Sequence, residues 1–320
     1  MKVDAVFEGG GVKGIGFTGA ISEIEKAGYS FENLVGTSAG AIVATLLAVG
    51  YSAKEIKEEL ESLNYELFKD KSTFGRSLGV LCKYGMYKGD YVEHWIEDLL
   101  RRKNISIFGD LITNYPEEKY KYKLQIIASD LSNKRILVLP RDLNLFGLDP
   151  NCFSIARAVR MSLSIPLFFQ PVPIYDNEGK KHIIVDGAVL SNYPIWLLDD
   201  NSANPPWPTF GFKLIEPMER KIKKTAKENV SNLIQYFQAL ISTMLHAHDK
   251  LHISQSKGDF ARTIAVPTTI TLNGERKTIK TTDFSISIEE SKLLYANGQR
   301  AARSFLRDWD FNQWKKDFRQ

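Results

Sequence analysis

The sequence predicts an α/β fold in which helices cover a mainly parallel sheet. Two observations lead to this prediction. A buried strand at residues 3–8 runs through a glycine loop into a helix that ends near Ala27, and a second strand, Asn33 to Gly36, runs into an apolar helix from Ala39 to Val49. The first 50 residues therefore contain two strand–loop–helix units, and such repeated units typically build parallel sheets covered by helices.

Apolar spacing and glycines define the helices of these two units. In the first helix the apolar residues recur at helical spacing until Gly28 stops it; they are Phe17, Ala20, Ile21 and Ile24. The second helix is alanine-rich and apolar throughout, but it is well short of the ~20 residues that span a bilayer. We therefore expect this second helix to be buried in the protein core.

The rest of the chain continues with alternating helices and strands. Periodicity predicts helices at 53–63, 90–102, 154–161, 225–252 and 289–307, and strands at 123–128, 135–139, 182–185, 210–215 and 261–266. Between them, residues 64–90 mix aromatic residues with glycines and predict a loop-rich cap, residues 163–174 are apolar and broken by prolines, and residues 199–208 predict a surface loop.

Composition sets only broad limits on function. The 320 residues are 43% hydrophobic and 25% charged, which is ordinary for a globular protein. A net charge of +4 is too weak to indicate nucleic-acid binding, but it would favour contact with anionic lipid surfaces. Two cysteines, Cys82 and Cys152, form no disulfide framework and predict a reducing cytoplasm. We see no signal-peptide pattern at the start of the sequence.

The segment Gly36-Thr37-Ser38-Ala39-Gly40 fits G-x-S-x-G, the turn that presents a serine nucleophile between a strand and a helix. Such a turn holds the serine backbone in a strained conformation that costs roughly 1–3 kcal/mol. Glycines on both sides remove Cβ clashes, and the following helix points its positive end at the serine. Ser38 is therefore the candidate nucleophile, supported by Gly36 and Gly40.

The glycine loop is the candidate oxyanion hole, formed by Gly9, Gly10, Gly11, Val12, Lys13 and Gly14. Its amides lie at the start of a helix and could stabilise a developing negative charge. The same loop fits G-x-G-x-x-G, a dinucleotide-binding pattern that expects an acidic residue at the end of the next strand, roughly 20 residues on. Glu32 instead precedes that strand. A nucleotide-binding protein remains an alternative.

The candidate general base is Asp186, which ends the strand Ile183-Ile184-Val185 and precedes Gly187. Burial at a strand end beside apolar residues would raise its pKa toward the range of a general base. A Ser-Asp-His arrangement that uses a late histidine, His246, His248 or His252, is the alternative. His182 starts the strand that Asp186 ends, roughly 13 Å away at ~3.3 Å per residue, so the two cannot serve one serine.

Taken together, three segments resemble the patatin-like phospholipases, a family of lipid acyl hydrolases: Gly9 to Gly14, Gly36 to Gly40, and Asp186-Gly187-Ala188. Weaker matches extend over nearly the whole chain, including residues 85–91, 128–131, 156–166 and 207–212. Two departures are Lys13 where many members have arginine, and Ala188 where others have a second glycine. An ammonium group keeps the positive charge of arginine but not its planar fork.

The resemblance implies a three-layer α/β/α sandwich that forms a single domain over residues 1–320, with a core at about 3–215 and an extension at about 216–320 packed on it. It implies a Ser38–Asp186 dyad without histidine, which hydrolyses lipid esters in the manner of a phospholipase A or lysophospholipase. It implies neither a metal nor another cofactor. The expected partner is a phospholipid or other lipid ester, with peripheral contact to a membrane surface, no nucleic acid and an undetermined oligomeric state.

Overall fold

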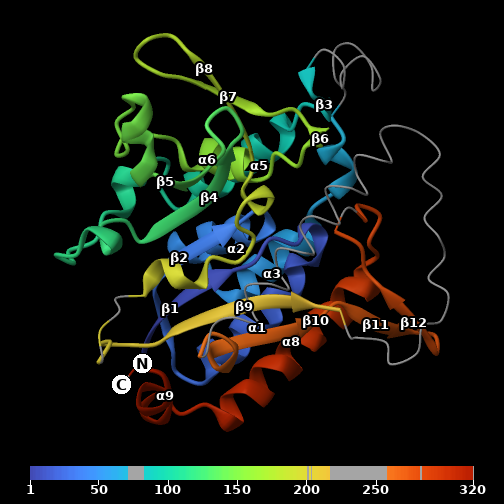
Figure 1. Ribbon diagram of the computed structural model, residues 1–320. Helices are drawn as coiled ribbons and strands as arrows, with labels where there is room; N and C mark the ends of the chain where they lie inside the picture. The colour runs from blue at the N-terminus through green and yellow to red at the C-terminus, as the bar shows by residue number, and fades with distance from the viewer. Residues whose placement is uncertain (71–82, 200–201, 203, 217–257, 282, 320) are drawn as a thin grey trace.

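A computed structural model describes residues 1–70, 83–199, 202, 204–216, 258–281 and 283–319. Among these residues the main sheet has eight strands in the order β10-β9-β1-β2-β4-β8-β7, with β5 also paired to β4 (Figure 1). Its strands are β1 (Lys2–Phe7), β2 (Ser30–Thr37), β4 (Leu124–Asp130), β5 (Arg135–Leu139), β7 (Val172–Tyr175), β8 (Lys181–Asp186), β9 (Thr209–Ile215) and β10 (Thr263–Pro267).

Most of this sheet is parallel, as predicted. β1 pairs in parallel with β2 and β9, β9 with β10, and β2 with β4, whereas β5, β7 and β8 are antiparallel to their neighbours. β1 and β2 therefore deliver the glycine loop and the serine turn to the same edge of the sheet. β8 runs antiparallel to β4, and its last residue, Asp186, lies beside that edge of the sheet. The register shows this, since Thr37 pairs with Ile127 and Asp186 pairs with the next residue, Ala128.

Helices flank the sheet, and most of the core lies on one side of it. In β1 the side chains of Val3, Ala5 and Phe7 join the larger apolar core, and Val6 joins a smaller one on the other face. Short 3-10 helices contribute to the smaller core. The α-helices are α1 (Ile15–Lys26), α2 (Ala39–Ala48), α3 (Ala53–Ser62), α5 (Asp90–Arg102), α6 (Ile155–Ser162), α8 (Ile288–Asp308) and α9 (Phe311–Phe318).

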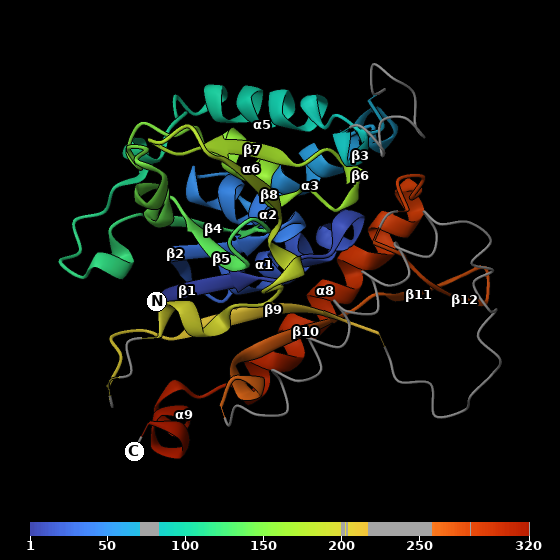
Figure 2. The same ribbon diagram turned by 45° about the horizontal axis from the view of Figure 1, so that its top comes forward.

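The 3-10 helices are short segments that join the larger elements, and two of them, η4 and η7, line the smaller core. Their bounds are η1 (Gly11–Gly14), η2 (Tyr65–Phe68), η3 (Phe108–Leu111), η4 (Glu118–Tyr120), η5 (Arg141–Phe146), η6 (Gly187–Val189), η7 (Ile195–Leu198) and η8 (Phe260–Arg262). Figure 2 shows α5 as the outermost helix at the top of the molecule, above α6. In this arrangement α6 reaches the sheet at β4 and β8, beside the candidate site.

Local sequence explains where the predicted helices begin and end. α2 is buried along its whole length, as its apolar composition requires. α3 starts with a capping box, in which Ser52 accepts from the Glu55 amide and Glu55 accepts from the Ser52 amide. α8 also starts with a capping box, formed by Ser287 and Glu290. The predicted boundaries of these helices are confirmed to within one or two residues.

The C-terminal part of the chain packs on the elements that come first. β10 extends the sheet beside β9, and α8 lies along α1, where the Arg303 guanidinium binds both carboxylate oxygens of Glu23 at 2.9 and 3.2 Å. The single-domain organisation remains a prediction. The helix predicted at 225–252 and part of the predicted cap, residues 71–82, lie outside the described residues.

Several elements were not predicted from the sequence. The apolar segment 163–174 forms β6 (Leu167–Phe169) and β7, and β6 pairs in parallel with β3 (Gly85–Tyr87). A hairpin of β11 (Thr269–Leu272) and β12 (Glu275–Thr278) follows β10, and α9 closes the described chain.

Candidate active site

Ser38 occupies the sharp turn between β2 and α2. Its backbone has φ 52° and ψ −123°, a left-handed conformation that costs roughly 1–3 kcal/mol in a residue other than glycine. The flanking glycines are required by close backbone contacts. A Cβ on Gly36 would lie 2.3 Å from the Gly40 carbonyl oxygen, and a Cβ on Gly40 would lie 2.3 Å from that of Phe7. The predicted turn is therefore present, with Ser38 at the amino end of α2.

A serine that the sequence analysis did not single out holds this turn. The Ser38 amide donates to Ser162 Oγ at 2.8 Å, and the Ser162 hydroxyl donates to the Ile127 carbonyl oxygen at 2.6 Å. Ser162 lies at the end of α6 and is fully buried. It therefore links the strained turn to β4, and no local motif around residue 38 could have revealed this contact.

Asp186 lies against Ser38, as expected. Its Oδ2 accepts the Ser38 hydroxyl at 2.7 Å, and its Oδ1 accepts the Ala188 amide at 2.8 Å. Both Ser38 and Asp186 are buried. Burial raises the pKa of Asp186 from its ordinary value of 3.8 to about 7, although the hydrogen bonds from Ser38 and Ala188 act in the opposite direction. A carboxyl group with this pKa could accept a proton from the serine near neutral pH.

A raised pKa alone does not identify a base, as Asp4 demonstrates. Burial also raises the pKa of Asp4 to about 7. However, Asp4 lies within β1 and accepts from the amide and the side-chain nitrogen of Asn33, at 3.0 and 2.8 Å. Geometry therefore distinguishes the two residues, because Asp186 is the one that contacts the candidate nucleophile.

The raised pKa of Asp186 predicts a pH-dependent gain of stability in Asp186→Asn. A carboxyl whose pKa is higher in the folded state gives stability that is complete below pH ~4 and is lost as pH rises through about 7. Asparagine does not ionise, so the Asp186→Asn variant does not lose this stability as pH rises. The difference in melting temperature between Asp186→Asn and the unaltered protein should therefore increase from pH 4 to pH 7 and then level off.

Asp149→Asn is the control for this stability measurement. Hydrogen bonds from the Cys152 thiol and the Asn151 amide lower the pKa of Asp149. Its contribution to stability is therefore lost only as pH falls below ~4. Asp149→Asn should show no comparable rise in melting-temperature difference between pH 4 and pH 7, and a change of the opposite sign below pH ~4. A difference for Asp186→Asn that does not vary with pH would contradict the raised pKa of this carboxyl.

The glycine loop lies beside the serine turn. A Cβ built on Gly9 would lie 3.2 Å from Ser38 Cβ. Three of the six predicted amides already have acceptors, since those of Gly9, Val12 and Lys13 donate to the carbonyl oxygens of Asn192, Thr281 and Gly10 at 3.3, 3.2 and 3.3 Å, respectively. Within the described part of the chain, the Gly10 and Gly11 amides have no acceptor. Among the five loop amides from Gly9 to Lys13, this leaves those of Gly10 and Gly11 as the candidate oxyanion donors.

An apolar pocket that opens to solvent extends from Ser38. Of the described residues that line it, none is charged. Its walls come from the glycine loop, α2, α3, η2 and the segment before α8; they include Ile42, Val43, Leu60, Tyr65, Phe68 and Phe284. Such a pocket suits an acyl chain better than a charged or strongly hydrated group.

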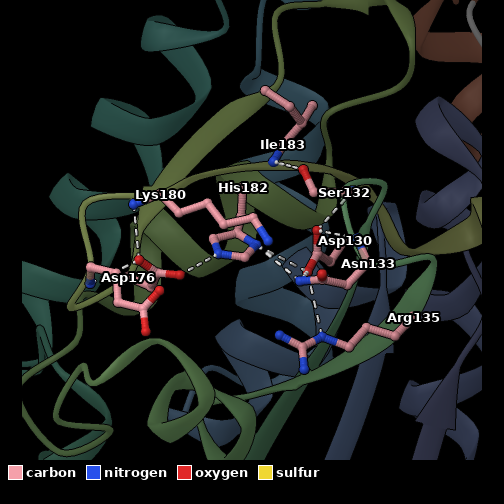
Figure 3. A network of polar contacts seen from close by, with 9 residues as sticks. Asp130, Ser132, Asn133, Arg135, Asp176, Lys180, His182 and Ile183 are labelled. Atoms are coloured by element: carbon pink, nitrogen blue, oxygen red, sulfur yellow. Dashed lines mark hydrogen bonds and ion pairs between the residues drawn. The ribbon is translucent and has the colours of Figure 1, made fainter.

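His182, which the sequence analysis rejected as a base, is engaged elsewhere. Its Nε2 lies 3.0 Å from Asp176 Oδ2, and its Nδ1 lies 3.0 Å from Asn133 Nδ2 (Figure 3). The amide nitrogen of Asn133 can only donate, so Nδ1 accepts and the Nε2–H group donates to Asp176. His182 thus joins the β7–β8 hairpin to the turn after β4.

Of the remaining histidines and cysteines, neither of the two that are described, His94 and Cys152, adds a group to the site. His94 is exposed on α5. His246, His248 and His252, the late histidines of the alternative triad, lie outside the described residues, as does Cys82. Among the residues that are described, no three His, Cys, Asp or Glu side chains are grouped so as to hold a metal ion. No helix in the same part of the chain is both long and apolar enough to cross a membrane.

A known protein family matches the part of the chain that contains this site. The family model described as "Patatin-like phospholipase" matches residues 5–199, the segment that contains the glycine loop, Ser38 and Asp186. The chain belongs to the patatin-like phospholipase family. It has the family's mixed α/β fold with a central, mostly parallel sheet flanked by helices. Membership in the family supports a lipid hydrolase activity.

Individual relatives differ in how much of the chain they match. The Bacillus subtilis (strain 168) protein YqhO is 39% identical over 317 residues, covering 97% of this chain and 100% of its own. An Escherichia coli protein named cUMP-AMP-activated phospholipase is 26% identical over 193 residues, covering 58% of this chain and 54% of its own. The crystal structure of VipD from Legionella pneumophila aligns with a TM-score of 0.58 at 18% identity, over 95% of this chain and 66% of VipD. At this level of identity, the similarity to VipD shows a shared fold.

Proposed function

We propose that this patatin-like phospholipase hydrolyses carboxylic esters of membrane lipids through a Ser38–Asp186 dyad and an acyl-enzyme intermediate. The observation that carries the proposal is the 2.7 Å hydrogen bond from Ser38 Oγ to Asp186 Oδ2, in a buried site at one end of an apolar pocket. A serine and a base in direct contact, with unused amides close by, form the constellation required for acyl transfer.

In the first half of the reaction, Ser38 Oγ attacks the ester carbonyl carbon while Asp186 accepts the hydroxyl proton. The electrons of the carbonyl double bond move to its oxygen, and the Gly10 and Gly11 amides stabilise the resulting oxyanion. Asp186 then returns the proton to the leaving oxygen as the carbon–oxygen bond breaks. The alcohol or lysophospholipid departs and leaves the acyl group esterified to Ser38.

Water completes the cycle by the same steps. Asp186 accepts a proton from water as its oxygen attacks the acyl carbon, and the same amides hold the second oxyanion. The bond to Ser38 Oγ breaks, and the proton passes from Asp186 to that oxygen, which releases the fatty acid. The amino end of α2 points toward Ser38 and favours negative charge there in both halves.

The pocket and the family both support the proposed substrate class. The uncharged walls beside Ser38 would hold one acyl chain, while the polar head group stays outside at the mouth. This arrangement fits a phospholipase A or lysophospholipase that works at a membrane surface, which a net charge of +4 would help it approach when the lipid is anionic.

Leu60→Trp should separate long-chain from short-chain substrates. Leu60 is a buried wall residue of the pocket on α3, and a larger ring would occupy space that a long acyl chain needs. We expect kcat/KM for a hexadecanoyl ester to fall at least ~10-fold relative to a butanoyl ester. Lys54→Trp places the same ring on the exposed side of α3 and should leave the ratio unchanged. An unchanged ratio in Leu60→Trp would show that the chain binds elsewhere.

The alternatives have less support from the described residues. The nucleotide-binding interpretation requires an acidic residue to bind a ribose, but Glu32 accepts from the Tyr115 hydroxyl at 2.8 Å and pairs with Lys2 at 3.5 Å. In the alternative triad, a histidine would have to stand between Ser38 and Asp186, whose side chains are in direct contact. Alanine replacement of each late histidine tests that alternative.

The test of the proposed function is fatty-acid release from mixed phospholipid vesicles with a chelator present. The unaltered protein should release fatty acid, Ser38→Ala should release none above background, and Ser62→Ala, an exposed serine on α3, should match the unaltered protein. Release by Ser38→Ala at the unaltered rate would refute the proposal. No release by the unaltered protein, together with no labelling by a fluorophosphonate, would refute it as well.

A further inference from the structure

A buried acidic residue immediately precedes the glycine loop. Glu8 follows β1, and only 2% of its surface is exposed. Its Oε1 accepts from Lys213 Nζ at 2.8 Å and from Asn192 Nδ2 at 3.2 Å, and its Oε2 accepts from the Leu214 amide at 2.6 Å. Lys213 is also buried, so both charges of this ion pair lie away from solvent.

The groups bound by Glu8 border the glycine loop directly. The Asn192 carbonyl oxygen accepts the Gly9 amide at 3.3 Å. The Leu214 side chain lies against the next glycine, because a Cβ built on Gly10 would be 2.0 Å from Leu214 Cδ1. One carboxylate therefore fixes the two residues against which Gly9 and Gly10 rest.

Glu8 also joins two other parts of the site. Asn192 lies a few residues after Asp186, on the segment that contains Ser191, whose carbonyl oxygen accepts the Thr37 hydroxyl at 3.3 Å. The glycine loop, the serine turn and the segment after Asp186 therefore meet in one hydrogen-bonded set. A shift of Glu8 would move the loop relative to Ser38.

We propose that Glu8, with Lys213 as its counter-ion, is a positioning residue that holds the Gly10 and Gly11 amides in place to stabilise the oxyanion. The inference rests on the proposed function, since it needs an oxyanion at this site. Amides stabilise a developing charge best when they are already oriented and need no rearrangement during the reaction. A small displacement of such donors lowers the rate without weakening the binding of the acyl chain.

Holding the two strands together does not by itself require this ion pair. β1 and β9 are joined by their parallel ladder, which continues in the bond from the Glu8 amide to the Phe212 carbonyl oxygen at 3.0 Å. A buried ion pair is often no more stabilising than apolar residues of similar size. The ion pair instead determines which groups face the glycine loop. Its role is therefore to position the loop, and not only to stabilise the fold.

Three variants separate the two roles. Glu8→Gln keeps the size of the side chain and removes its charge, which leaves Lys213 without its counter-ion. The double variant Glu8→Gln with Lys213→Met removes both charges and avoids the buried unpaired cation. Asp199→Asn is the matched control, because Asp199 binds the buried Arg262 at 2.6 and 2.8 Å and does not line the pocket at Ser38.

The readout is inhibition by a lipid trifluoromethyl ketone, compared with the corresponding alcohol. Ser38 Oγ adds to the ketone carbon, its proton passes to Asp186, and the carbonyl oxygen becomes an oxyanion that needs the loop amides. The alcohol fills the same pocket and forms no oxyanion. The ratio of the two inhibition constants therefore measures the oxyanion site, and the melting temperature measures stability.

We expect Glu8→Gln to lower kcat and ketone affinity by about 10- to 100-fold, while KM and alcohol affinity change less than ~3-fold. The double variant should recover the melting temperature but not the ketone affinity. Asp199→Asn should lower the melting temperature and leave the inhibitor ratio intact.

An unchanged inhibitor ratio in both Glu8 variants would overturn the inference while leaving the proposed function standing. The double variant provides this test even where Glu8→Gln alone does not fold. An unaltered protein that neither hydrolyses an ester nor binds the ketone would instead overturn the proposed function, and this inference with it.

Discussion

Asp186→Asn is expected to lower kcat for lipid esters by about 10³- to 10⁴-fold without disturbing the fold. Asn has nearly the same size, and its side-chain oxygen can still accept the Ser38 hydroxyl or the Ala188 amide, each of which now lies within 2.8 Å of the carboxylate. It cannot take up the serine proton. The variant should melt at or above the temperature of the unaltered protein at pH 8, and fatty-acid release should be measured under the same conditions.

Asp4→Asn is the matched control for this loss of activity. Asp4 shares the raised pKa of about 7, but it binds Asn33 and does not contact the serine. Its replacement should leave kcat within ~3-fold of the unaltered value. An Asp186→Asn variant that kept full turnover would show that another group acts as the base, and His246, His248 and His252 would be the next residues to replace.

After Ser38→Ala and Asp186→Asn, Gly11→Ala should have the next largest effect on turnover. Gly11 has φ +57°, and an added Cβ would lie 1.9 Å from the Thr281 carbonyl oxygen, which accepts the Val12 amide. The loop must therefore move away from Thr281, and the Gly10 and Gly11 amides move with it. Loss of an oxyanion donor typically lowers kcat by about 10²- to 10³-fold. Steady-state kinetics on a soluble ester would measure the loss.

Gly28→Ala separates this effect from backbone strain. Gly28 also has a left-handed backbone, with φ +83°, but no atom lies within 4 Å of an added Cβ. This variant should lose about 1 kcal/mol of stability and keep its turnover. If Gly11→Ala lost no more activity than Gly28→Ala, the glycine loop would not be the oxyanion site.

The sequence was sufficient to single out Ser38 and Asp186, which the fold places in direct contact, because local pattern determines both positions. The turn at Ser38 requires glycines on either side of it, and Asp186 ends a short apolar strand before small residues. These are interactions between neighbours along the chain, so they leave a readable motif. The order of strand and helix in the first 50 residues likewise predicted the parallel part of the sheet.

The supporting residues could not be found in this way, because tertiary packing determines their roles. Ser162 reaches the Ser38 amide only because α6 packs across β4. The acceptor for the Val12 amide comes from Thr281, near the other end of the chain. Neither contact can be recognised as a local pattern. Which amides of the glycine loop have a hydrogen-bond acceptor therefore depends on residues near both ends of the sequence.

One missed element did carry a readable signal. The β11–β12 hairpin turns at Asn273-Gly274, where both residues have positive φ, at 51° and 81°. Asn-Gly between two short strands is the strongest local sign of a tight hairpin. The polar composition of β12, whose residues are all exposed, obscured the strand pattern.

Trapping the acyl-enzyme tests the central claim most directly. The unaltered protein would be mixed with an activated lipid ester, quenched in acid within one turnover, and its peptides analysed by mass spectrometry. The dyad mechanism predicts an acyl group on Ser38, and none when Ser38→Ala is treated in the same way. Ester hydrolysis that proceeds with no adduct on Ser38, or with the acyl group on another residue, would contradict it.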